Sequence, residues 1–349
     1  MRALVKTARG PGNLEMRDVP VPLPGPGDAL IRVVNAAVCG TDGHIARGRF
    51  PCTPPMVLGH EFSGVVERVG RDVTEVKPGD AVVSENNPFA CGVCRLCRLD
   101  LPNLCPSKRA MGIHSDGCFA EYVRLPAHLL HRVPAGVSME EAALSEPLAV
   151  ATHAVTDRCG IEQGDTVVVM GPGAIGLLAA QVARAEGAGR VLLAGTGRDE
   201  PLRFGRAREL GLRTANVESE DVGRLVADMT GGDGADVVVE ASGSPAAIAL
   251  GVRLLRRGGR MVVAGITGKT ETAVPWDAMT GKAVSVLFSY SSRRRNWDKG
   301  LRYLAGGTVR TLPLVTHRLR LEQWQEALAM LDTMESIRTV FHIGPEPAP

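Results

Sequence analysis

Four cysteines lie within fifteen residues and are spaced as metal ligands, in the order Cys91-x2-Cys94-x2-Cys97-x7-Cys105. Zinc favours four thiolates in a closed tetrahedron, and a short loop can surround one ion when its ligands recur every third residue. An iron–sulfur cluster is the competing metal site, whereas two-residue spacers and a reducing compartment argue against disulfide pairing. Because four protein ligands leave no open position for a substrate, we expect a structural zinc site, held by a lobe at residues 86–110, with the chemistry elsewhere.

A second set of candidate ligands is scattered over two turn-rich segments. These segments supply a thiol, an imidazole and a carboxylate at Cys39, His60 and Glu61. A catalytic zinc typically takes three protein ligands and keeps one position open. Each residue alone is ambiguous, since a single Cys is commonly a small buried apolar side chain and a single His is commonly structural. Asp42, close to Cys39, is expected to cap a turn.

A glycine-rich turn follows an apolar run at residues 166–170 and leads into a helical pattern. In this strand-to-helix setting, the pattern G-x-G-x-x-G allows a tight turn, close approach of a pyrophosphate and close packing of helix on strand. The N-terminus of the helix then faces the anion. We therefore expect a dinucleotide-binding site, with coenzyme contacts from Gly171, Gly173, Ala174, Ile175 and Gly176.

The residue that contacts the adenosine ribose should lie about 20 positions further on, at the end of the second strand. That position is Gly195, not an acid. The following residues offer Arg198 for the 2′-phosphate of NADP, or Asp199 and Glu200 as displaced acids for the free 2′-hydroxyl of NAD. The sequence leaves the choice between NAD and NADP open.

The length of 349 residues suggests two domains. Residues 1–152 contain short strand-like runs separated by Pro and Gly, which predicts a β-rich, barrel-like domain. Residues 153–292 alternate strand runs with helical patterns, which is typical of a parallel, doubly wound α/β sheet. The six predicted strands cover residues 166–170, 191–194, 214–217, 236–240, 260–264 and 283–288. Residues 293–349, with a predicted helix at 319–333 and a strand at 339–343, are expected to return to the first domain.

The composition is that of a folded globular protein, with 44% apolar and 22% charged residues. Forty Lys and Arg oppose 38 Asp and Glu, so the net charge of +2 provides no broad basic surface for nucleic acid or acidic membranes. Apolar stretches fall short of the roughly 20 residues of a membrane span, and the N-terminus lacks the pattern of a secretory signal. We expect a cytoplasmic protein that binds a small molecule, with no nucleic-acid or membrane partner.

Taken together, these motifs resemble the zinc-containing medium-chain alcohol dehydrogenases, whose signature G-H-E-x2-G-x5-G-x2-V recurs at residues 59–73. The resemblance covers nearly the whole chain and implies a GroES-like β-rich catalytic domain beside a six-stranded Rossmann domain. The segment Ser145-Glu146-Pro147-Leu148 is similar to the sorbitol and threonine dehydrogenase branch. The resemblance therefore implies Cys39, His60 and Glu146 as catalytic zinc ligands. It places Glu61 beside the metal, without a fixed bond to it.

The resemblance also implies the chemistry. One thiolate and one carboxylate neutralise Zn²⁺, which then acts as a Lewis acid that lowers the pKa of a bound alcohol, so that hydride can pass to the nicotinamide. Thr41 and His44 are implied as the relay that carries the proton away. Ala241 and Ile266, just after two of the predicted strands, are implied as further coenzyme contacts. The expected cofactors are two zinc ions per subunit, one catalytic and one structural, and NAD or NADP.

Sorbitol dehydrogenases carry Arg-Tyr where this chain has Ser289-Tyr290, and this difference argues against sorbitol itself. The leading interpretation is a dehydrogenase that converts a secondary alcohol of a polyol, cyclitol, amino-cyclitol or sugar-like substrate to the ketone. Phe119 and Tyr290 are expected to shape its pocket. L-Threonine or a butanediol-type alcohol is the alternative substrate.

A zinc loop that binds nucleic acid is the alternative outside the enzyme class, but it does not predict Cys39, His60 and Glu146 together. The resemblance implies a homo-oligomer, with a tetramer favoured over a dimer.

Overall fold

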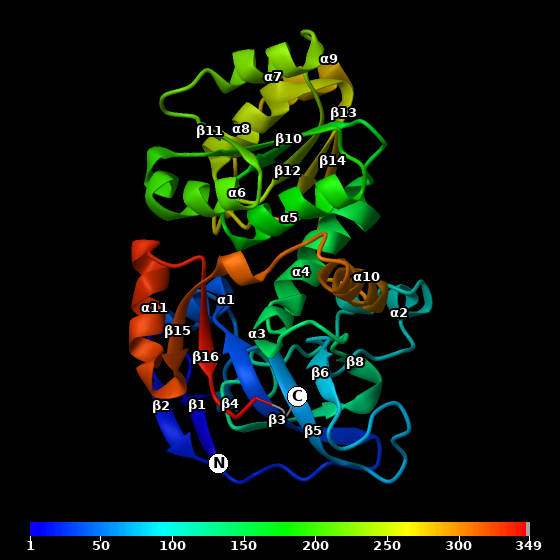
Figure 1. Cartoon of the computed structure of the whole chain (residues 1–349), viewed down its shortest axis with the longest axis vertical. Helices are drawn as coiled ribbons and strands as arrows, with labels where there is room; N and C mark the ends of the chain where they lie inside the picture. Colours follow the sequence, from blue (N-terminus) through cyan, green and yellow to red (C-terminus); the bar gives the residue numbers. More distant parts are fainter. Residues whose placement is uncertain (347–349) are drawn as a thin grey trace. The chain divides into compact units, whose positions relative to one another are not determined.

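The computed structural model describes residues 1–346 and divides the chain into two compact units. The first unit comprises Met1–Glu146, Arg293–Ala305 and Leu314–Pro349, and the second comprises Pro147–Ser292 and Gly306–Pro313. In Figure 1, segments from blue to blue-green, together with most of the orange and red segments near the end of the chain, build the first unit, while the remaining green and the yellow segments build the second. The last part of the chain thus contributes to both units.

The first unit is built on two sheets. The smaller has the order β2-β1-β4, and the larger has the order β15-β16-β3-β5-β6-β8, with β7 also paired to β3. The strands are β1 (Arg2–Lys6), β2 (Leu14–Asp18), β3 (Asp28–Ala37), β4 (Met56–Val57), β5 (Glu61–Val69), β6 (Ala81–Ser84), β7 (Tyr122–Pro126), β8 (Leu130–Arg132), β15 (Val315–Arg320) and β16 (Arg338–His342). Because β3 pairs with β5, β7 and β16, it lies at the centre of the larger sheet and is buried over most of its length.

Short helices accompany these sheets: α1 (Gly40–Ala46), α2 (Arg95–Arg98), α3 (Met139–Ala142), α10 (Arg294–Ala305) and α11 (Trp324–Thr333). Helix α10 is fastened to the sheet by His131, whose ring stacks on Trp297 with centroids 5.7 Å apart and whose Nδ1 lies 2.9 Å from an oxygen of Asp298. The segment that begins at Arg293 therefore packs on the first unit through specific side-chain contacts.

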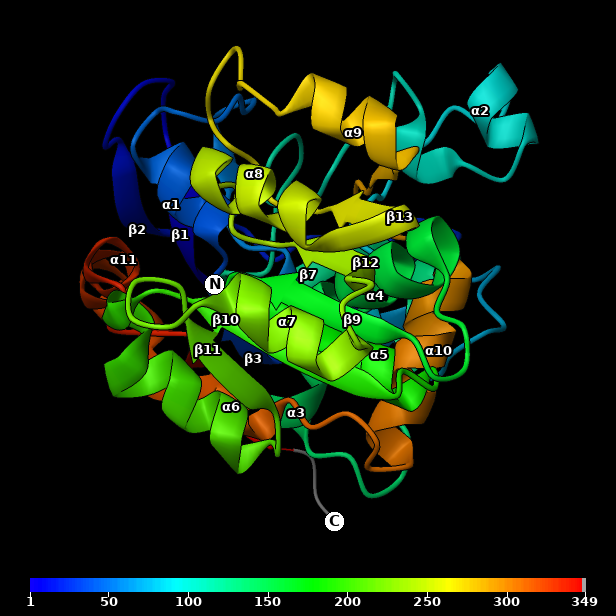
Figure 2. The same cartoon turned by 90° about the horizontal axis from the view of Figure 1, so that it is seen from above.

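The second unit is a six-stranded, all-parallel sheet with the order β11-β10-β9-β12-β13-β14. Its strands are β9 (Thr166–Met170), β10 (Arg190–Gly195), β11 (Arg213–Asn216), β12 (Ala235–Glu240), β13 (Leu255–Val263) and β14 (Ser285–Phe288). Its helices are α4 (Ser145–Thr152), which begins in the first unit, α5 (Ala174–Ala185), α6 (Gly205–Glu209), α7 (Val222–Thr230), α8 (Pro245–Leu254) and α9 (Trp276–Lys282). Figure 2 shows α8 and α9 on one face of the sheet and α6 on the other. The strand order reverses between β9 and β12, as in doubly wound nucleotide-binding folds.

The helix predicted at residues 319–333 is partly wrong. The helix begins only at Trp324, and Val315–Arg320 forms β15, which pairs in parallel with β16. Exposure along β15 rises and falls with a period of about two residues, which suits a strand at a sheet edge. At residues 319 and 320, pairing with β16 outweighs the helical pattern of the sequence. The strand predicted at residues 339–343 corresponds to β16.

Within residues 1–346, none of the helices combines the length and the apolar character needed to cross a membrane.

Candidate active site and zinc sites

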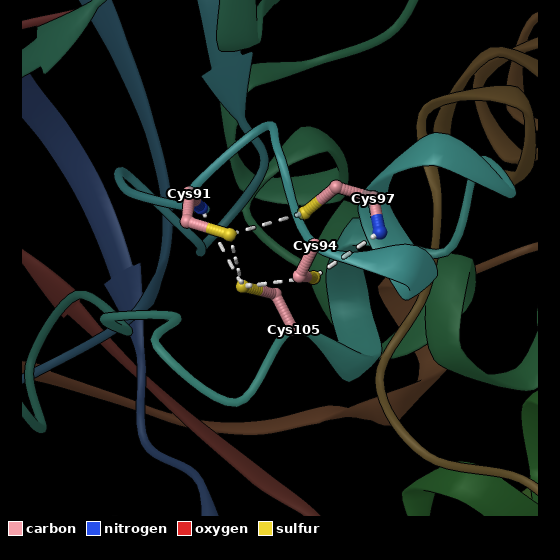
Figure 3. Close-up of side chains that lie close together, drawn as sticks. All are labelled: Cys91, Cys94, Cys97 and Cys105. Carbon is pink, nitrogen blue, oxygen red and sulfur yellow. Dashed lines mark hydrogen bonds between the residues drawn. The ribbon is translucent and has the colours of Figure 1, made fainter.

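The four cysteines of the lobe converge on one point (Figure 3). Their Sγ atoms are 3.6 Å apart for Cys91 and Cys105, 4.0 Å for Cys91 and Cys97, and 4.0 Å for Cys94 and Cys105. A tetrahedron of thiolates at about 2.3 Å from zinc has edges of about 3.8 Å, whereas a disulfide needs about 2.05 Å. The thiols are therefore spaced to hold one zinc ion and are unpaired with one another.

Backbone donors favour thiolates in this lobe. Cys94 caps the N-terminus of α2, and its sulfur accepts the N–H of Cys97 at 3.5 Å, while the sulfur of Cys105 accepts the N–H of Cys91 at 3.4 Å. The backbone N–H groups of Val93 and Cys94 lower the pKa of Cys91 to about 6. Thiolate is the form that binds metal, so the loop favours at Cys91 the charge state that zinc requires. At Cys97, burial and then Cys94 raise the pKa to about 12.

The second ligand set is assembled by strand pairing. Cys39 follows β3 at the N-terminus of α1, and Glu61 begins β5, where it pairs with Ala37. The ligand atoms of Cys39, His60 and Glu61 all lie within 4.8 Å of one another. His60 and Glu61 are buried. The pairing of β3 with β5 thus brings together residues that the sequence keeps 21 positions apart.

Asp42 links the backbone of this cluster to His60. Its Oδ2 accepts the N–H of Cys39 at 2.9 Å, so the predicted capping role is present, and its Oδ1 lies 3.5 Å from Nδ1 of His60. Burial alone would lower the pKa of His60, but Asp42 and then Cys39 outweigh it and hold this pKa well above its ordinary value. A carboxylate on Nδ1 fixes the ring and leaves Nε2 for a metal.

Glu61 faces a buried cation that the sequence analysis missed. One oxygen of Glu61 lies 3.2 Å from the guanidinium of Arg338, which also donates to the carbonyl of Val38 at 3.4 Å. Burial raises the pKa of Glu61, and Arg338 opposes this shift. The other oxygen of Glu61 is buried without a hydrogen-bond partner among the described residues. No motif in the sequence marks Arg338, because it approaches Glu61 only through the pairing of β16 with β3.

Glu146 lies outside the 4.8 Å group but interacts with its charges. It begins α4 and accepts a hydrogen bond from the side chain of Asn86 at 2.6 Å. Burial, and then the negative charge of Glu61, raise the pKa of Glu146 to about 7. Three buried acids therefore surround His60 and Cys39, namely Asp42, Glu61 and Glu146.

The predicted relay residues share α1. Thr41 Oγ1 lies 3.7 Å from the sulfur of Cys39, and His44 is exposed one helical turn further on. Residues three apart on a helix are neighbours on its surface. Burial, and then Arg47 and Arg49, lower the pKa of His44.

The two predicted pocket residues have different surroundings. Phe119 is 1% exposed and packs edge-on against Phe341, with ring centroids 5.2 Å apart. A side chain at Gly59 would collide with the Phe119 ring, so Phe119 supports the backbone before His60 from the core. Tyr290 belongs to the other unit and is 51% exposed. Substrate contact by either residue stays a prediction.

The glycine-rich turn of the second unit gives each glycine a separate role. Gly171 has φ +102°, which disfavours other residues, and a Cβ there would lie 2.8 Å from Ser242. Gly173 precedes α5 with open space around it, whereas a side chain at Gly176 would collide with the carbonyl of Gly171. These geometries suit a tight turn, access for a pyrophosphate and close helix packing, in that order. Ala174 and Ile175 form the first turn of α5.

The end of β10 carries no free acid. Asp199 accepts the backbone N–H and the hydroxyl of Thr196 at 2.9 and 3.1 Å and forms an ion pair with Arg203 at 2.9 Å. Its carboxylate is therefore already paired within the protein. Glu200 pairs with Arg208 at 3.0 Å. Arg198 is exposed. A Cβ at Gly195 would lie 2.8 Å from the carboxylate of Asp199.

Glu218 is a further acid at this edge that the sequence analysis missed. From the loop after β11, it accepts the N–H of Gly197 at 2.8 Å. The remaining predicted coenzyme contacts lie at the same edge of the sheet, with Ala241 directly after β12 and Ile266 exposed in the loop after β13.

Comparison with known proteins identifies both units. Residues 25–135 match the alcohol dehydrogenase GroES-like domain, and residues 174–306 match the zinc-binding dehydrogenase family. A sorbitol dehydrogenase of Halalkalibacterium halodurans is 38% identical over 97% of this chain and 98% of its own length. An L-threonine 3-dehydrogenase of Bacillus licheniformis is 35% identical over 95% of each chain.

Among solved structures, a protein of Sinorhizobium meliloti 1021 named as a zinc-binding dehydrogenase and bound to NADP has a TM-score of 0.90, with 32% identity over 99% of both chains. The predicted GroES-like and Rossmann architecture is confirmed. The chain therefore belongs to the zinc-binding medium-chain alcohol dehydrogenases and is a zinc-dependent NAD(P) dehydrogenase of the polyol and threonine type.

Proposed function

We propose that this dehydrogenase interconverts a secondary alcohol of a polyol, cyclitol, amino-cyclitol or sugar-like substrate and its ketone, with Cys39, His60 and Glu146 as the ligands of a catalytic zinc. The observation that carries the proposal is the convergence of a thiol, an imidazole and buried carboxylates at the end of β3. A bound zinc ion supplies a Lewis acid that lowers the pKa of an alcohol hydroxyl. A separate zinc ion held by the four-cysteine lobe has a structural role.

The charges around Glu61 and Glu146 support this choice of ligands. Glu61 is paired with Arg338 at 3.2 Å, so part of its charge is already compensated inside the protein. Burial, and then the negative charge of Glu61, raise the pKa of Glu146 to about 7, and Asn86 holds one of its oxygens in place. A divalent cation nearby would favour the ionised form of Glu146.

Thr41 and His44 are the proposed proton relay. The hydroxyl beside Cys39 can accept the substrate proton and donate its own onward, and the exposed imidazole of His44 can release that proton to water. The lowered pKa of His44 keeps its ring neutral near pH 7, as a proton acceptor must be.

The substrate preference depends on the charges available near Cys39. An L-threonine substrate brings a carboxylate that needs a cation, and Arg338 beside the cluster is already paired with Glu61. A neutral polyol, cyclitol or sugar needs only hydrogen bonds, and Ser289 in place of the Arg of sorbitol dehydrogenases argues against sorbitol itself. L-Threonine and a butanediol-type alcohol remain the second candidates because the threonine dehydrogenase relative is nearly as similar as the sorbitol dehydrogenase.

The test is a panel of polyols, cyclitols, amino-cyclitols, L-threonine and 2,3-butanediol, each assayed with NAD and with NADP by the absorbance of the reduced nicotinamide. We expect the highest kcat/KM for a polyol, cyclitol or sugar-like member. Activity on L-threonine that rivals the best polyol would overturn this order. If zinc-loaded wild-type protein turned over every member of the panel no faster than the Cys39→Ser variant does, the proposed function would be contradicted.

We also propose a cytoplasmic homo-oligomer, with a tetramer favoured over a dimer. Phe288 ends β14, the edge strand of the six-stranded sheet, and both Phe288 and Trp276 are 70% exposed. An open sheet edge with unpaired backbone groups can pair with a second copy of the chain, which supports assembly. Light scattering coupled to size-exclusion chromatography should give the mass of four subunits. A monomeric mass would contradict the proposal.

A further inference from the structure

Glu240 is a fully buried acid at the carboxyl end of β12, outside both zinc sites. It is 0% exposed and has no cationic partner among residues 1–346. A buried charge without a counter-ion is costly. The position of Glu240 in the coenzyme-binding unit suggests a functional reason for a buried acid without a counter-ion.

Donors converge on one oxygen of Glu240. Its Oε1 accepts the N–H of Ser242 at 2.9 Å, the hydroxyl of Ser242 at 2.5 Å and the N–H of Gly243 at 2.9 Å. Three donors on one oxygen hold the carboxyl group of Glu240 in a single orientation. The other oxygen, Oε2, is buried and accepts no hydrogen bond from the residues that the structure describes.

The same residue joins three loops at the coenzyme edge. Its carbonyl accepts the N–H groups of Ala264 and Gly265 at 2.8 and 3.1 Å, and a side chain at Gly265 would collide with Oε2. Ser242, held by Glu240, in turn packs against Gly171 at the start of the glycine-rich turn. Glu240 therefore sits directly beneath the loops that follow β9, β12 and β13.

The topology indicates which half of the coenzyme lies above Glu240. Dinucleotides bind across the carboxyl edge where the strand order reverses, with the pyrophosphate at the N-terminus of the first helix and the adenosine ribose at the end of the second strand. In this chain these positions are α5 and Gly195 on β10. The nicotinamide half would then extend to the other side of the point between β9 and β12 where the strand order reverses, over β12 and β13.

We propose that the buried carboxylate of Glu240 stabilises the oxidised coenzyme, whose nicotinamide carries a positive charge, relative to the neutral reduced form. This inference rests on the proposed function, since it concerns the coenzyme of the same reaction. A fixed negative charge without a counter-ion attracts the cationic ring through a protein interior of low dielectric constant. Reduction removes that charge, so Glu240 weakens the binding of the product coenzyme relative to the reactant in the direction of alcohol oxidation.

The test compares dissociation constants of zinc-loaded enzyme for the oxidised and the reduced coenzyme, measured by isothermal titration calorimetry without substrate. In Glu240→Gln, which removes the charge at nearly constant shape, we expect the ratio Kd(oxidised)/Kd(reduced) to rise by at least about threefold. Binding of ADP-ribose, which lacks the nicotinamide, should stay within about twofold and reports an intact coenzyme edge.

Two variants that keep the charge serve as controls for loop movement. Glu240→Asp and Ser242→Ala disturb the hydrogen bonds, so both dissociation constants should rise together while their ratio stays unchanged. If Kd(oxidised)/Kd(reduced) were unchanged in Glu240→Gln, the proposal would be overturned. It would also be overturned if either control variant changed this ratio as much as Glu240→Gln does. If the wild type bound neither coenzyme form, the proposed function itself would fail, which separates the two outcomes.

Discussion

The two candidate zinc sites offer different ligands and are built in opposite ways. In the lobe, four thiols come from fifteen consecutive residues, and the turns between them supply backbone N–H groups that favour thiolates. Among the proposed catalytic ligands, Cys39 and Glu146 are 107 positions apart, and both lie among buried acids. The first site depends on local spacing, whereas the second depends on the pairing of β3 with β5 and on the start of α4. The comparison favours the proposal that the lobe stabilises the fold and that the cluster at Cys39 is the site of the reaction.

The largest effect is expected for Cys39→Ser. Loss of the thiolate should lower kcat by at least about a thousandfold, because the catalytic zinc loses a ligand and its position beside Thr41. Zinc content should fall from two ions per subunit to one, with unchanged circular dichroism and ADP-ribose affinity. Substantial turnover by Cys39→Ser would contradict the assignment of a catalytic role to the cluster at Cys39 and a structural role to the lobe.

Glu146→Gln and Glu61→Gln distinguish the two buried carboxylates. We expect Glu146→Gln to lower kcat by at least about a hundredfold and to lose catalytic zinc, since a neutral amide is a poor zinc ligand. Glu61→Gln should retain zinc, because Glu61 is paired with Arg338. Kinetics and metal analysis of both variants check this assignment. Full activity in Glu146→Gln would refute its role as a necessary ligand and favour Glu61.

Asp42→Asn tests whether the cluster depends on an acid that orients His60. The variant keeps the size of the side chain but removes the charge that faces Nδ1 of His60 at 3.5 Å. Zinc affinity at the catalytic site should fall by about 10- to 100-fold, as is usual when the partner of a metal-binding His is lost. Competition with a chromogenic chelator measures this affinity. Wild-type affinity would show that Asp42 acts only as the cap of α1.

Cys97→Ser should have the smallest effect on turnover. Because Cys97 belongs to the closed lobe, kcat per folded subunit should stay within about threefold of wild type. The apparent Tm should fall by at least about 5 °C, since zinc binding contributes to the folding free energy of such lobes. Differential scanning calorimetry and active-site titration check both values. A loss of kcat equal to that of Cys39→Ser, at unchanged Tm, would contradict the division of roles.

Much of the fold and part of the site follow from the sequence, and the failures have physical causes. The glycine-rich turn and the four cysteines are local patterns whose geometry depends on near neighbours, so their expected arrangements agree with the structure. The helix predicted at residues 319–333 starts five residues too early, because Leu319 and Arg320 end β15, whose pairing with β16 is a long-range contact. Arg338 and Glu240 gave no motif signal, because their importance comes from burial beside groups far away in sequence.

The zinc content of fully loaded wild-type protein tests the central claim most directly. Inductively coupled plasma mass spectrometry on protein quantified by amino-acid analysis should give two zinc ions per subunit, one for the lobe and one for the cluster at Cys39. A value of one ion per subunit, unchanged by Cys39→Ser and abolished by Cys97→Ser, would contradict the account.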